Sequence, residues 1–519
     1  MKKLFTLFTA LLVVCAVSAK TWEISPESPE ASDNLRITLG KASTGDVIEL
    51  ADGTYPESNS NYILIDAKNV TIKAAKGAHP IVQPRVPIQI KGGSHVQIYG
   101  VAFDASHLQD GGHTDYEYLI YAIDATVGNK LTIDSCEFYN HKYNKSTIHC
   151  GGDYKLDEVT ISNCYFHDNN KSCMFFENTD MTSLTVTNST FANIAVGSTS
   201  SYHAGIIDAR TSSGTVRVDH CTFYNCVPMN NDYGSVGKIE TTDAIVSYCI
   251  FVMPNPLGSS SGRAIRMNSG SKANYCLTYN YQADYKGIRT DVTRTGILYD
   301  TDPQFQDSAN CNFTLRSGSP ALNVDIGGGV YENLGDPRWI STSLTSMAHD
   351  KITYITPKEL DFSYTAGLTA YRAASATASG VTMVPVTKVP KNTPLVLIGT
   401  AGADYSIVGA ALPNRIGTNL LVQGDGTTVF NGTTWDYLLY SDGLFYQIGS
   451  GTVATDKAYL HLDGAPSSAA GLRMIFDNNG ATDINAIEAD EEGVKFIENG
   501  KFLIKKNGVV YNALGQIVR

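Results

Sequence analysis

An internal repeat between residues 131 and 279 constrains the fold of this chain more than any other feature. Each unit contains a short run of alternating apolar residues, then a cysteine or serine, then an aromatic residue two positions later. The aligned cysteine or serine is Cys136, Cys164, Ser189, Cys221, Cys249 and Cys276. The aromatic residues are Phe138, Phe166, Phe191, Phe223 and Phe251, with Tyr279 as an approximate match. A period of roughly 28 residues is typical of solenoids, in which each repeat forms one coil.

The alternation within each unit predicts short β-strands, because every second side chain of a strand points to the same face. A unit of this length cannot bury its apolar face alone, so successive units must stack. Stacking at about 4.8 Å places equivalent residues above one another and forms continuous internal columns. No long segment has helical periodicity. The sequence therefore predicts an all-β chain with a right-handed parallel β-helix over residues 20–340.

The chain contains 10 cysteines, which in an exported protein would first suggest disulfide bonds. Most of them recur at one position of the coil, so we interpret them as small apolar core residues that stay reduced. Disulfide bonds between neighbouring coils and metal binding are the alternatives.

The N-terminus has the pattern of an export signal. Lys2 and Lys3 precede an apolar stretch at residues 4–17, and a small-residue cleavage site follows. The apolar stretch is too short to span a membrane, and no later segment approaches a membrane span. We therefore expect a signal peptide over residues 1–19 and an exported protein, with lipid attachment at Cys15 as an alternative.

The formal net charge of the chain is −12. A nucleic-acid-binding protein needs clustered basic surface to neutralise phosphates, so we expect no nucleic-acid partner. We interpret the acidic balance as a contribution to solubility and expect a monomer.

Two corner motifs resemble those of pectate-lyase-type β-helices. Gly45-Asp-Val-Ile-Glu-Leu-Ala-Asp-Gly-Thr-Tyr55 opens the solenoid, and Ser317-Gly-Ser-Pro-Ala321 closes it. Within that superfamily the chain resembles the chondroitinase B and alginate lyase family, over roughly residues 22–340. The resemblance implies an acidic polysaccharide as partner and polysaccharide lyase as an activity. The motifs themselves are structural corners and carry no chemistry.

Charged residues recur on the third strand of successive coils, the face that binds sugar in this superfamily. The outward positions are Lys91, Asp124, His149, Glu177, Asp208, Arg210, Lys238, Glu240, Arg263 and Arg266. An ordinary strand surface would carry Thr, Ser and Asn there. The column is either a solvated face with ion pairs between coils, such as Asp208 with Lys238, or a binding site for an acidic polysaccharide.

β-Elimination on a uronic acid needs a neutralised carboxylate, a base that removes the C5 proton and an acid for the leaving oxygen. In the family that the chain resembles, a lysine base and an arginine acid lie on adjacent coils. Lys238 and Arg266 match that pair in strand position and spacing, so the resemblance implies these catalytic roles for them. We expect the neighbouring residues Arg210, Arg263, His149 and Glu240 to bind substrate.

Calcium can neutralise the sugar carboxylate in that family. Its acidic ligands lie just before the lysine, where this chain reads Asn231-Asp-Tyr-Gly234. Asp232 is the acidic residue there, so Glu177 and Asp208 from earlier coils would have to complete a calcium site. Hydrolysis by paired carboxylates would have to use the same two residues. Two functions stay open: a lyase, or a non-catalytic protein that binds glycan or acts in surface adhesion.

The composition changes after about residue 337, and residues 341–353 look like a linker. Short alternating strands separated by turn residues then predict a β-sandwich-like accessory domain over residues 354–490. Residues 389–397 and 457–460 resemble a C-terminal module of exported proteins of Gram-negative gut-type anaerobes. The resemblance implies an extracellular, outer-surface or periplasmic location.

Two features of this C-terminal third are candidates for function. Trp435 and Tyr437 could stack on sugar rings if the module binds carbohydrate. Residues 491–519 are predicted to form a hairpin with Asn507-Gly508 as its turn. This tail is either the last hairpin of the module or a sorting or anchoring signal.

Overall fold

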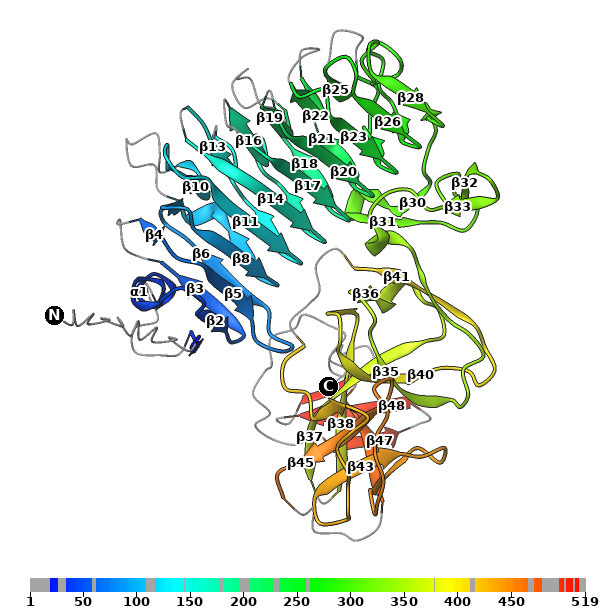
Figure 1. Ribbon diagram of the computed structural model, residues 1–519. Coiled ribbons are helices and arrows are strands. Elements are labelled where there is room, and N and C mark those ends of the chain that lie inside the picture. Colours follow the sequence, from blue (N-terminus) through cyan, green and yellow to red (C-terminus); the bar gives the residue numbers. More distant parts are fainter. Residues whose placement is uncertain are drawn as a thin grey trace, which may run out of the picture.

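The computed structural model shows a long β-helix with a second β domain beside one of its faces (Figure 1). The described residues are 19–26, 34–57, 62–108, 117–143, 145–152, 154–177, 181–195, 205–211, 213–226, 233–257, 262–377, 379–410, 416–464, 471–477, 494–498, 501–506 and 509–512, the last three as backbone. The predicted signal peptide before Ala19 and the predicted metal ligand Asp232 lie outside these residues. The described part of the chain contains no helix with the length and apolarity that crossing a membrane would require.

Sheet A of the β-helix takes the first strand of each coil, and its strands pair in parallel from one coil to the next. Its strands are β1 (Thr21–Ile24), β2 (Val47–Leu50), β5 (Val70–Ala74), β8 (His95–Tyr99), β11 (Asn129–Asp134), β14 (Leu156–Ser162), β17 (Ser183–Thr187), β20 (Thr215–Asp219), β23 (Ala244–Ser247), β26 (Lys272–Asn274) and β28 (Thr293–Thr295). Helix α1 (Asn34–Lys41) lies beside the first coils (Figure 1).

Sheet B follows sheet A after a sharp corner. Its strands are β3 (Gly53–Pro56), β6 (Pro80–Gln83), β9 (Ala102–Asp104), β12 (Glu137–Tyr139), β15 (Tyr165–His167), β18 (Thr190–Ile194), β21 (Thr222–Cys226), β24 (Ile250–Val252), β27 (Leu277–Tyr279) and β29 (Leu298–Tyr299). The corner residue before each aligned cysteine or serine has a positive φ, for example 53° at Asn163 and 49° at His220. This left-handed conformation lets the chain turn within one residue between two strands.

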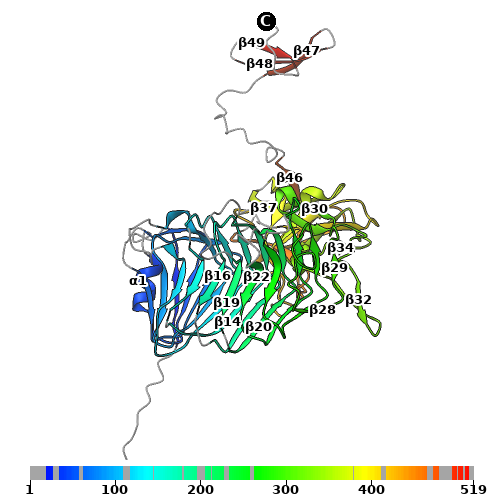
Figure 2. The ribbon, with the colours of Figure 1, turned by 90° about the horizontal axis from the view of Figure 1, so that it is seen from above.

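Sheet C closes each coil and carries the predicted site. Its strands are β4 (Ile63–Asp66), β7 (Ile88–Lys91), β10 (Ile120–Ala122), β13 (Ile148–Cys150), β16 (Met174–Glu177), β19 (Ile207–Arg210), β22 (Gly234–Ile239) and β25 (Arg263–Met267). Figure 2 shows the strands of successive coils running side by side along the helix. The predicted fold class, a right-handed parallel β-helix in an all-β chain, is confirmed.

The interior columns follow the repeat seen in the sequence. The phenylalanine rings stack from coil to coil, with centroids 4.7 Å apart for Phe138 and Phe166 and again for Phe223 and Phe251. The column cysteines are free and buried. The thiol of Cys164 donates to the carbonyl of Ser162 at 3.1 Å. The aligned residues therefore act as core residues, as the period predicts.

The chain after the last coil folds back over the outer face of sheet B. This segment contains β30 (Phe305–Asp307), β31 (Asn312–Leu315), β32 (Val324–Gly327), β33 (Val330–Glu332) and the short 3-10 helix η4 (Pro337–Trp339). Trp339 is 1 % exposed and packs with Tyr165, Tyr224 and Phe313 in a second apolar cluster outside the coils. Sheet B is therefore buried on both faces along its later coils, and it is closed there to a polymer.

The C-terminal domain is built on a long, nearly closed sheet with antiparallel pairing except between β38 and β46. In order, its strands are β35 (Lys351–Ile355), β40 (Pro394–Ile398), β37 (Thr369–Thr377), β38 (Gly380–Val386), β46 (Leu472–Phe476), β44 (Leu444–Gln447), β43 (Trp435–Leu439), β45 (Ala458–Leu462) and β42 (Leu421–Gln423). A smaller sheet has the order β34 (Thr342–Leu344), β41 (Tyr405–Gly409), β36 (Leu360–Asp361) and β39 (Lys388–Val389).

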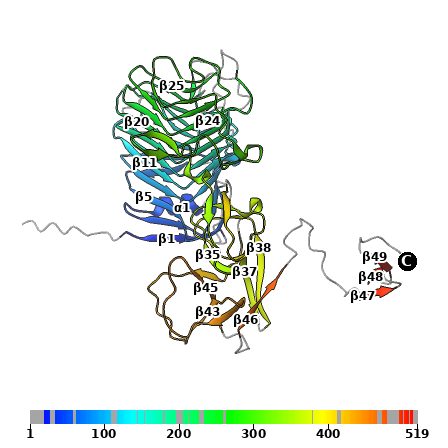
Figure 3. The same ribbon diagram turned by 90° about the vertical axis from the view of Figure 1, so that its right-hand side faces the viewer.

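The last described strands form a small antiparallel sheet of their own (Figure 3). They are β47 (Val494–Glu498), β48 (Lys501–Lys506) and β49 (Val509–Asn512). Strands β48 and β49 pair on either side of the predicted turn, which itself lies outside the described residues.

Candidate functional site

The outer face of sheet C brings together side chains from successive coils. Tyr121, His149, Phe175 and Asp208 are register neighbours on β10, β13, β16 and β19. The residues on either side of each, such as Ile148 and Cys150, belong to the interior core of the β-helix. Because strand side chains alternate between faces, the four neighbours form one outward column.

His149 lies inside an aromatic stack in this column. Its ring is parallel to that of Tyr118, with centroids 4.0 Å apart, and it also stacks on Phe175 at 5.6 Å. Burial, assisted by the charge of Lys145, lowers the pKa of His149 to about 3. The imidazole is therefore neutral at physiological pH, and it supplies shape and a ring nitrogen rather than charge.

Arg210 joins the two predicted metal ligands in one cluster. Its Nη1 donates to Oε1 of Glu177 at 2.7 Å, from the neighbouring coil. Its Nε and Nη2 donate to the two carboxylate oxygens of Asp208 at 3.2 and 3.1 Å. The guanidinium also lies over the ring of Phe175, 4.6 Å from its centroid. Burial opposes the charge of Arg210, but the two ion pairs outweigh it and raise its pKa.

Lys238 stands at an irregular point of β22, next to Arg266 on β25. Gly237 pairs with Arg266 and Ile239 pairs with Met267, so Lys238 is the extra residue of a β-bulge. Bulges are frequent beside active sites because they re-aim a side chain. The structure describes Lys238 by its backbone, which lies between the Gly237–Arg266 pair and the Ile239–Met267 pair.

Glycines make this bulge sterically accessible. A Cβ added at Gly237 would lie 2.3 Å from the backbone nitrogen of Gly234 and 2.6 Å from its carbonyl oxygen. A Cβ at Gly234 would lie 3.0 Å from the backbone nitrogen of Arg266. The close approach of these backbones therefore requires glycine at both positions.

The remaining predicted residues lie around this centre. Arg263 forms an ion pair with Asp284. Glu240 follows β22 and its carbonyl accepts a hydrogen bond from Nδ2 of Asn268 at 2.7 Å. Asp124 has a structural role, since it accepts hydrogen bonds from the backbone of Gly92 and Thr126, which hold its pKa well below the usual range.

The sequence interpretation named an ion pair between Asp208 and Lys238. The side chain of Lys238 lies outside what the structure describes, and Asp208 is bonded to Arg210 on its own strand. Positions i and i+2 share a face, so the guanidinium reaches the carboxylate without crossing a coil. The aromatic stack was not predicted. Tyr121 and Phe175 occupy outward strand positions, so aligning their coils with the coil of His149 could have found them. Tyr118 precedes strand β10, and its position does not recur from coil to coil.

Glu177 and Asp208 are two of the three predicted metal ligands, and the third, Asp232, lies outside the described residues. No group of three or more His, Cys, Asp or Glu side chains that could hold a metal ion occurs in the described ranges. Glu177 and Asp208 are both bonded to Arg210.

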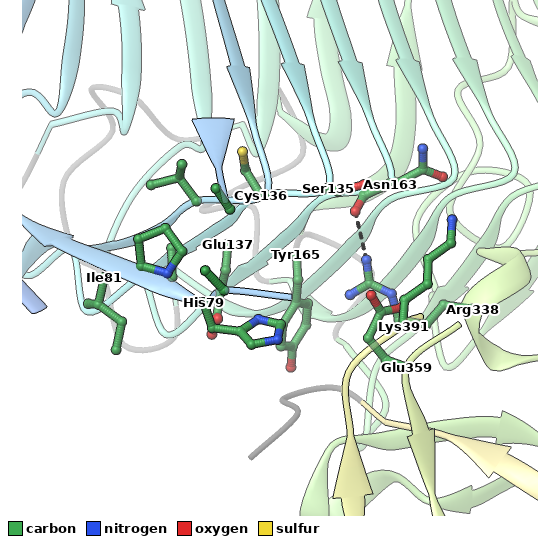
Figure 4. A pocket seen from close by; sticks show the side chains of 16 residues that line it. His79, Ile81, Ser135, Cys136, Glu137, Asn163, Tyr165, Arg338, Glu359 and Lys391 are labelled. Carbon is green, nitrogen blue, oxygen red and sulfur yellow. Dashed lines mark hydrogen bonds between the residues drawn. The ribbon is translucent and has the colours of Figure 1, made fainter. Parts of the chain in front are cut away.

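A cleft lies between the early coils of sheet B and the C-terminal domain (Figure 4). Its volume is about 270 Å³. Residues from both parts line it, including Ile81, Glu137, Asn163, Arg338, Glu359 and Lys391. The guanidinium of Arg338 donates to the carbonyl of Asn163 at 2.7 Å and closes one end. None of the described site residues predicted from the sequence lines this cleft.

The two aromatic residues predicted to stack on sugar in the C-terminal domain differ in exposure. Trp435 is 37 % exposed, but Tyr437 is 6 % exposed and packs in the domain core with Phe445 and Leu460. Tyr437 is therefore a core residue, because its strand position faces the interior of the nearly closed sheet.

Two family models match the chain, and both describe domains of unknown function. DUF4957 matches residues 53–194, and DUF5123 matches residues 216–339. No curated protein matches the chain. The comparisons with sequences therefore assign no activity.

Two solved structures of the PL6-family alginate lyase AlyGC, one of them of a mutant, are similar to the chain. Sequence identity is 18% in both comparisons, with TM-scores of 0.35 and 0.34. The aligned region covers 54% of this chain and 38% and 40% of those chains. The chain thus spans about two fifths of the enzymes it matches, and function has to be argued from the site itself.

Proposed function

We propose that the outer face of sheet C engages an acidic polysaccharide and cleaves it by β-elimination. The observation that carries this proposal is the β-bulge that places Lys238 immediately after Gly237, the residue that pairs with Arg266 on the next coil. Two cations on adjacent coils, at a strand irregularity, suit a polymer that runs along the helix axis.

In this reaction Lys238, in its neutral form, takes the proton from C5 of a uronic acid. The C5–H electron pair forms the C4=C5 double bond, and the C4–O bond to the leaving sugar breaks. Arg266 supplies the proton or the positive charge that the leaving oxygen needs. Neighbouring positive charge favours the neutral form of a lysine, because two like charges disfavour each other.

Polymer contacts would extend along the column of outward side chains. The aromatic stack around His149 is buried and supports this face from within, and Arg210 offers a fixed guanidinium. A polymer bound there would cross several coils, which lie about 4.8 Å apart. This spacing lets one extended chain contact residues of successive strands at once.

The test is ultraviolet absorbance of the unsaturated product, with alginate, chondroitin, dermatan, heparin and pectin as substrates. We expect a rise with one of them, reduced about 10²-fold or more in Lys238→Ala and in Arg266→Ala. Lys272→Ala and Arg217→Ala on sheet A are the matched controls and should keep the activity.

The second candidate is a non-catalytic glycan-binding or adhesion protein with the same face. It is favoured by the side chains of Glu177 and Asp208, which are occupied by an internal ion pair rather than open to a ligand. Retention on an immobilised glycan without any absorbance rise would establish this function and refute the lyase. Absence of both would refute glycan engagement.

A further inference from the structure

We infer that Arg210 takes the place of a divalent cation between Glu177 and Asp208, so that this face engages an acidic glycan without calcium. The exclusion of a divalent cation follows from the geometry of Arg210, Glu177 and Asp208 alone. The engagement of an acidic glycan rests on the proposed function.

The guanidinium occupies the space between the two carboxylates that a bridging cation would need. Three of its N–H groups donate to three carboxylate oxygens, two on Asp208 and one on Glu177. Calcium binds through six to eight oxygens at about 2.3–2.6 Å. Calcium would have to compete with the guanidinium for these oxygens, and two cations this close repel each other, so one cation excludes the other.

Arg210 is also firmly held in this position. The Asp208 side chain is fully buried and that of Arg210 is 11% exposed. The pair is bidentate, which is the strongest geometry for an arginine and a carboxylate. If the guanidinium left, the buried carboxylate of Asp208 would lose an ion pair and two hydrogen bonds, which is unfavourable. Arginine keeps its charge throughout the physiological pH range, so deprotonation cannot release it.

The guanidinium keeps capacity for a ligand. It has five N–H donors, and the contacts with Glu177 and Asp208 use three of them. A uronate carboxylate that reaches the remaining donors would complete a fork geometry that arginine favours. The cluster as a whole carries one net negative charge, so long-range attraction of an acidic chain depends on Lys238 and Arg266 on the following coils.

The first arm of the test needs no glycan. The melting temperature of the purified protein is measured with calcium chloride and with a chelator, for wild type, Arg210→Met and Arg210→Lys. We expect wild type and Arg210→Lys to be insensitive to calcium, because each keeps a positive charge between the carboxylates. Arg210→Met should melt at a lower temperature and gain several degrees with calcium, since it frees Glu177 and Asp208.

A wild-type melting temperature that rises with calcium, with a rise that disappears in Glu177→Gln, would overturn the inference. A rise that stays unchanged in Glu177→Gln places calcium elsewhere and leaves the cluster as inferred. Terbium luminescence reports metal binding independently of stability and should give the same pattern.

The second arm measures retention on immobilised alginate and pectate, with and without a chelator. We expect equal retention of wild type in both conditions and a loss of at least tenfold in Arg210→Met with the chelator. Retention that requires calcium would contradict the inference. If no glycan is retained in either condition, the proposed function fails, while the melting experiment still decides which cation the cluster holds.

Discussion

Thr190 and Asp336 are 146 residues apart in the sequence and share a buried hydrogen bond of 2.7 Å. The Thr190 hydroxyl donates to Oδ2 of Asp336 and accepts from Nε1 of Trp339 at 2.8 Å. The backbone nitrogen of Asp336 donates in turn to Oγ1 of Thr222. Two neighbouring coils thus hold the segment that covers sheet B.

The first prediction concerns this clamp, the buried hydrogen bonds that join Thr190 to Asp336 and Trp339. Thr190→Val should destabilise the protein by about 1–3 kcal/mol, because a buried carboxylate oxygen and a buried indole N–H both lose their partner. The measurement is the urea unfolding midpoint, followed by tryptophan fluorescence. Thr185→Val, the same change on sheet A, should shift stability by no more than about 0.5 kcal/mol. Equal effects of the two substitutions would contradict the clamp.

The second prediction concerns acid sensitivity through His149. The pKa of this histidine is about 3 in the folded protein and about 6.5 in an unfolded chain. As the pH falls below about 6.5, the unfolded chain binds a proton that the folded protein refuses, so stability is lost. Urea midpoints at pH 7 and at about pH 4.5 should show a smaller loss in His149→Phe, by roughly 2 kcal/mol.

His107→Phe, at the exposed end of the 3-10 helix η1 (Ala105–His107), serves as the control, because it removes an exposed imidazole in place of a buried one. His167 acts in the opposite direction, because Glu137 and Asp168 outweigh its burial and raise its pKa. The stability that His167 contributes is fully present below about pH 6.5 and is lost as the pH rises through the pKa of His167 in the folded protein. If His149→Phe leaves the acid profile unchanged, the ring takes up its proton at the same pH in the folded protein as in the unfolded chain, which would contradict the prediction.

The third prediction concerns the thiols. The nine described cysteines are free, and all except the partly exposed Cys311 are buried. Burial raises the pKa of Cys150 and Cys226, which keeps the unreactive thiol form. A thiol reagent should therefore label the native protein slowly, with Cys311→Ser removing the fastest reaction. After unfolding without reductant all nine should react, and a smaller number would reveal disulfide bonds.

The fourth prediction concerns the bulge. Gly237→Ala should reduce glycan engagement at least tenfold, because its Cβ would meet the backbone of Gly234 and shift the neighbouring Lys238. Retention on immobilised alginate and pectate is the measurement. Gly449→Ala has no atom within 4 Å of the added Cβ and should leave retention unchanged. Full retention of Gly237→Ala would show that glycan binding does not depend on the bulge.

The residues of the candidate site could be placed only in part from the sequence. The alternation along β16 and β19 predicts that Glu177, Asp208 and Arg210 point outward on neighbouring coils, because strand direction and coil stacking are local properties. That the guanidinium would join both carboxylates depends on rotamers and on the ring of Phe175, which the pattern does not specify. The bulge at Lys238 depends on the register of β22 against β25.

The sequence by itself determined the coil, its interior columns and the strand that carries the charged residues. A period of two within strands and a period of about 28 between coils are enough for this, since each coil contacts its neighbours in a regular stack. The tertiary structure alone decided which faces are covered. Trp339 on Thr190 and Tyr118 on His149 are contacts without periodicity, formed where loops and the later chain pack against the solenoid, and only their packing energy selects them.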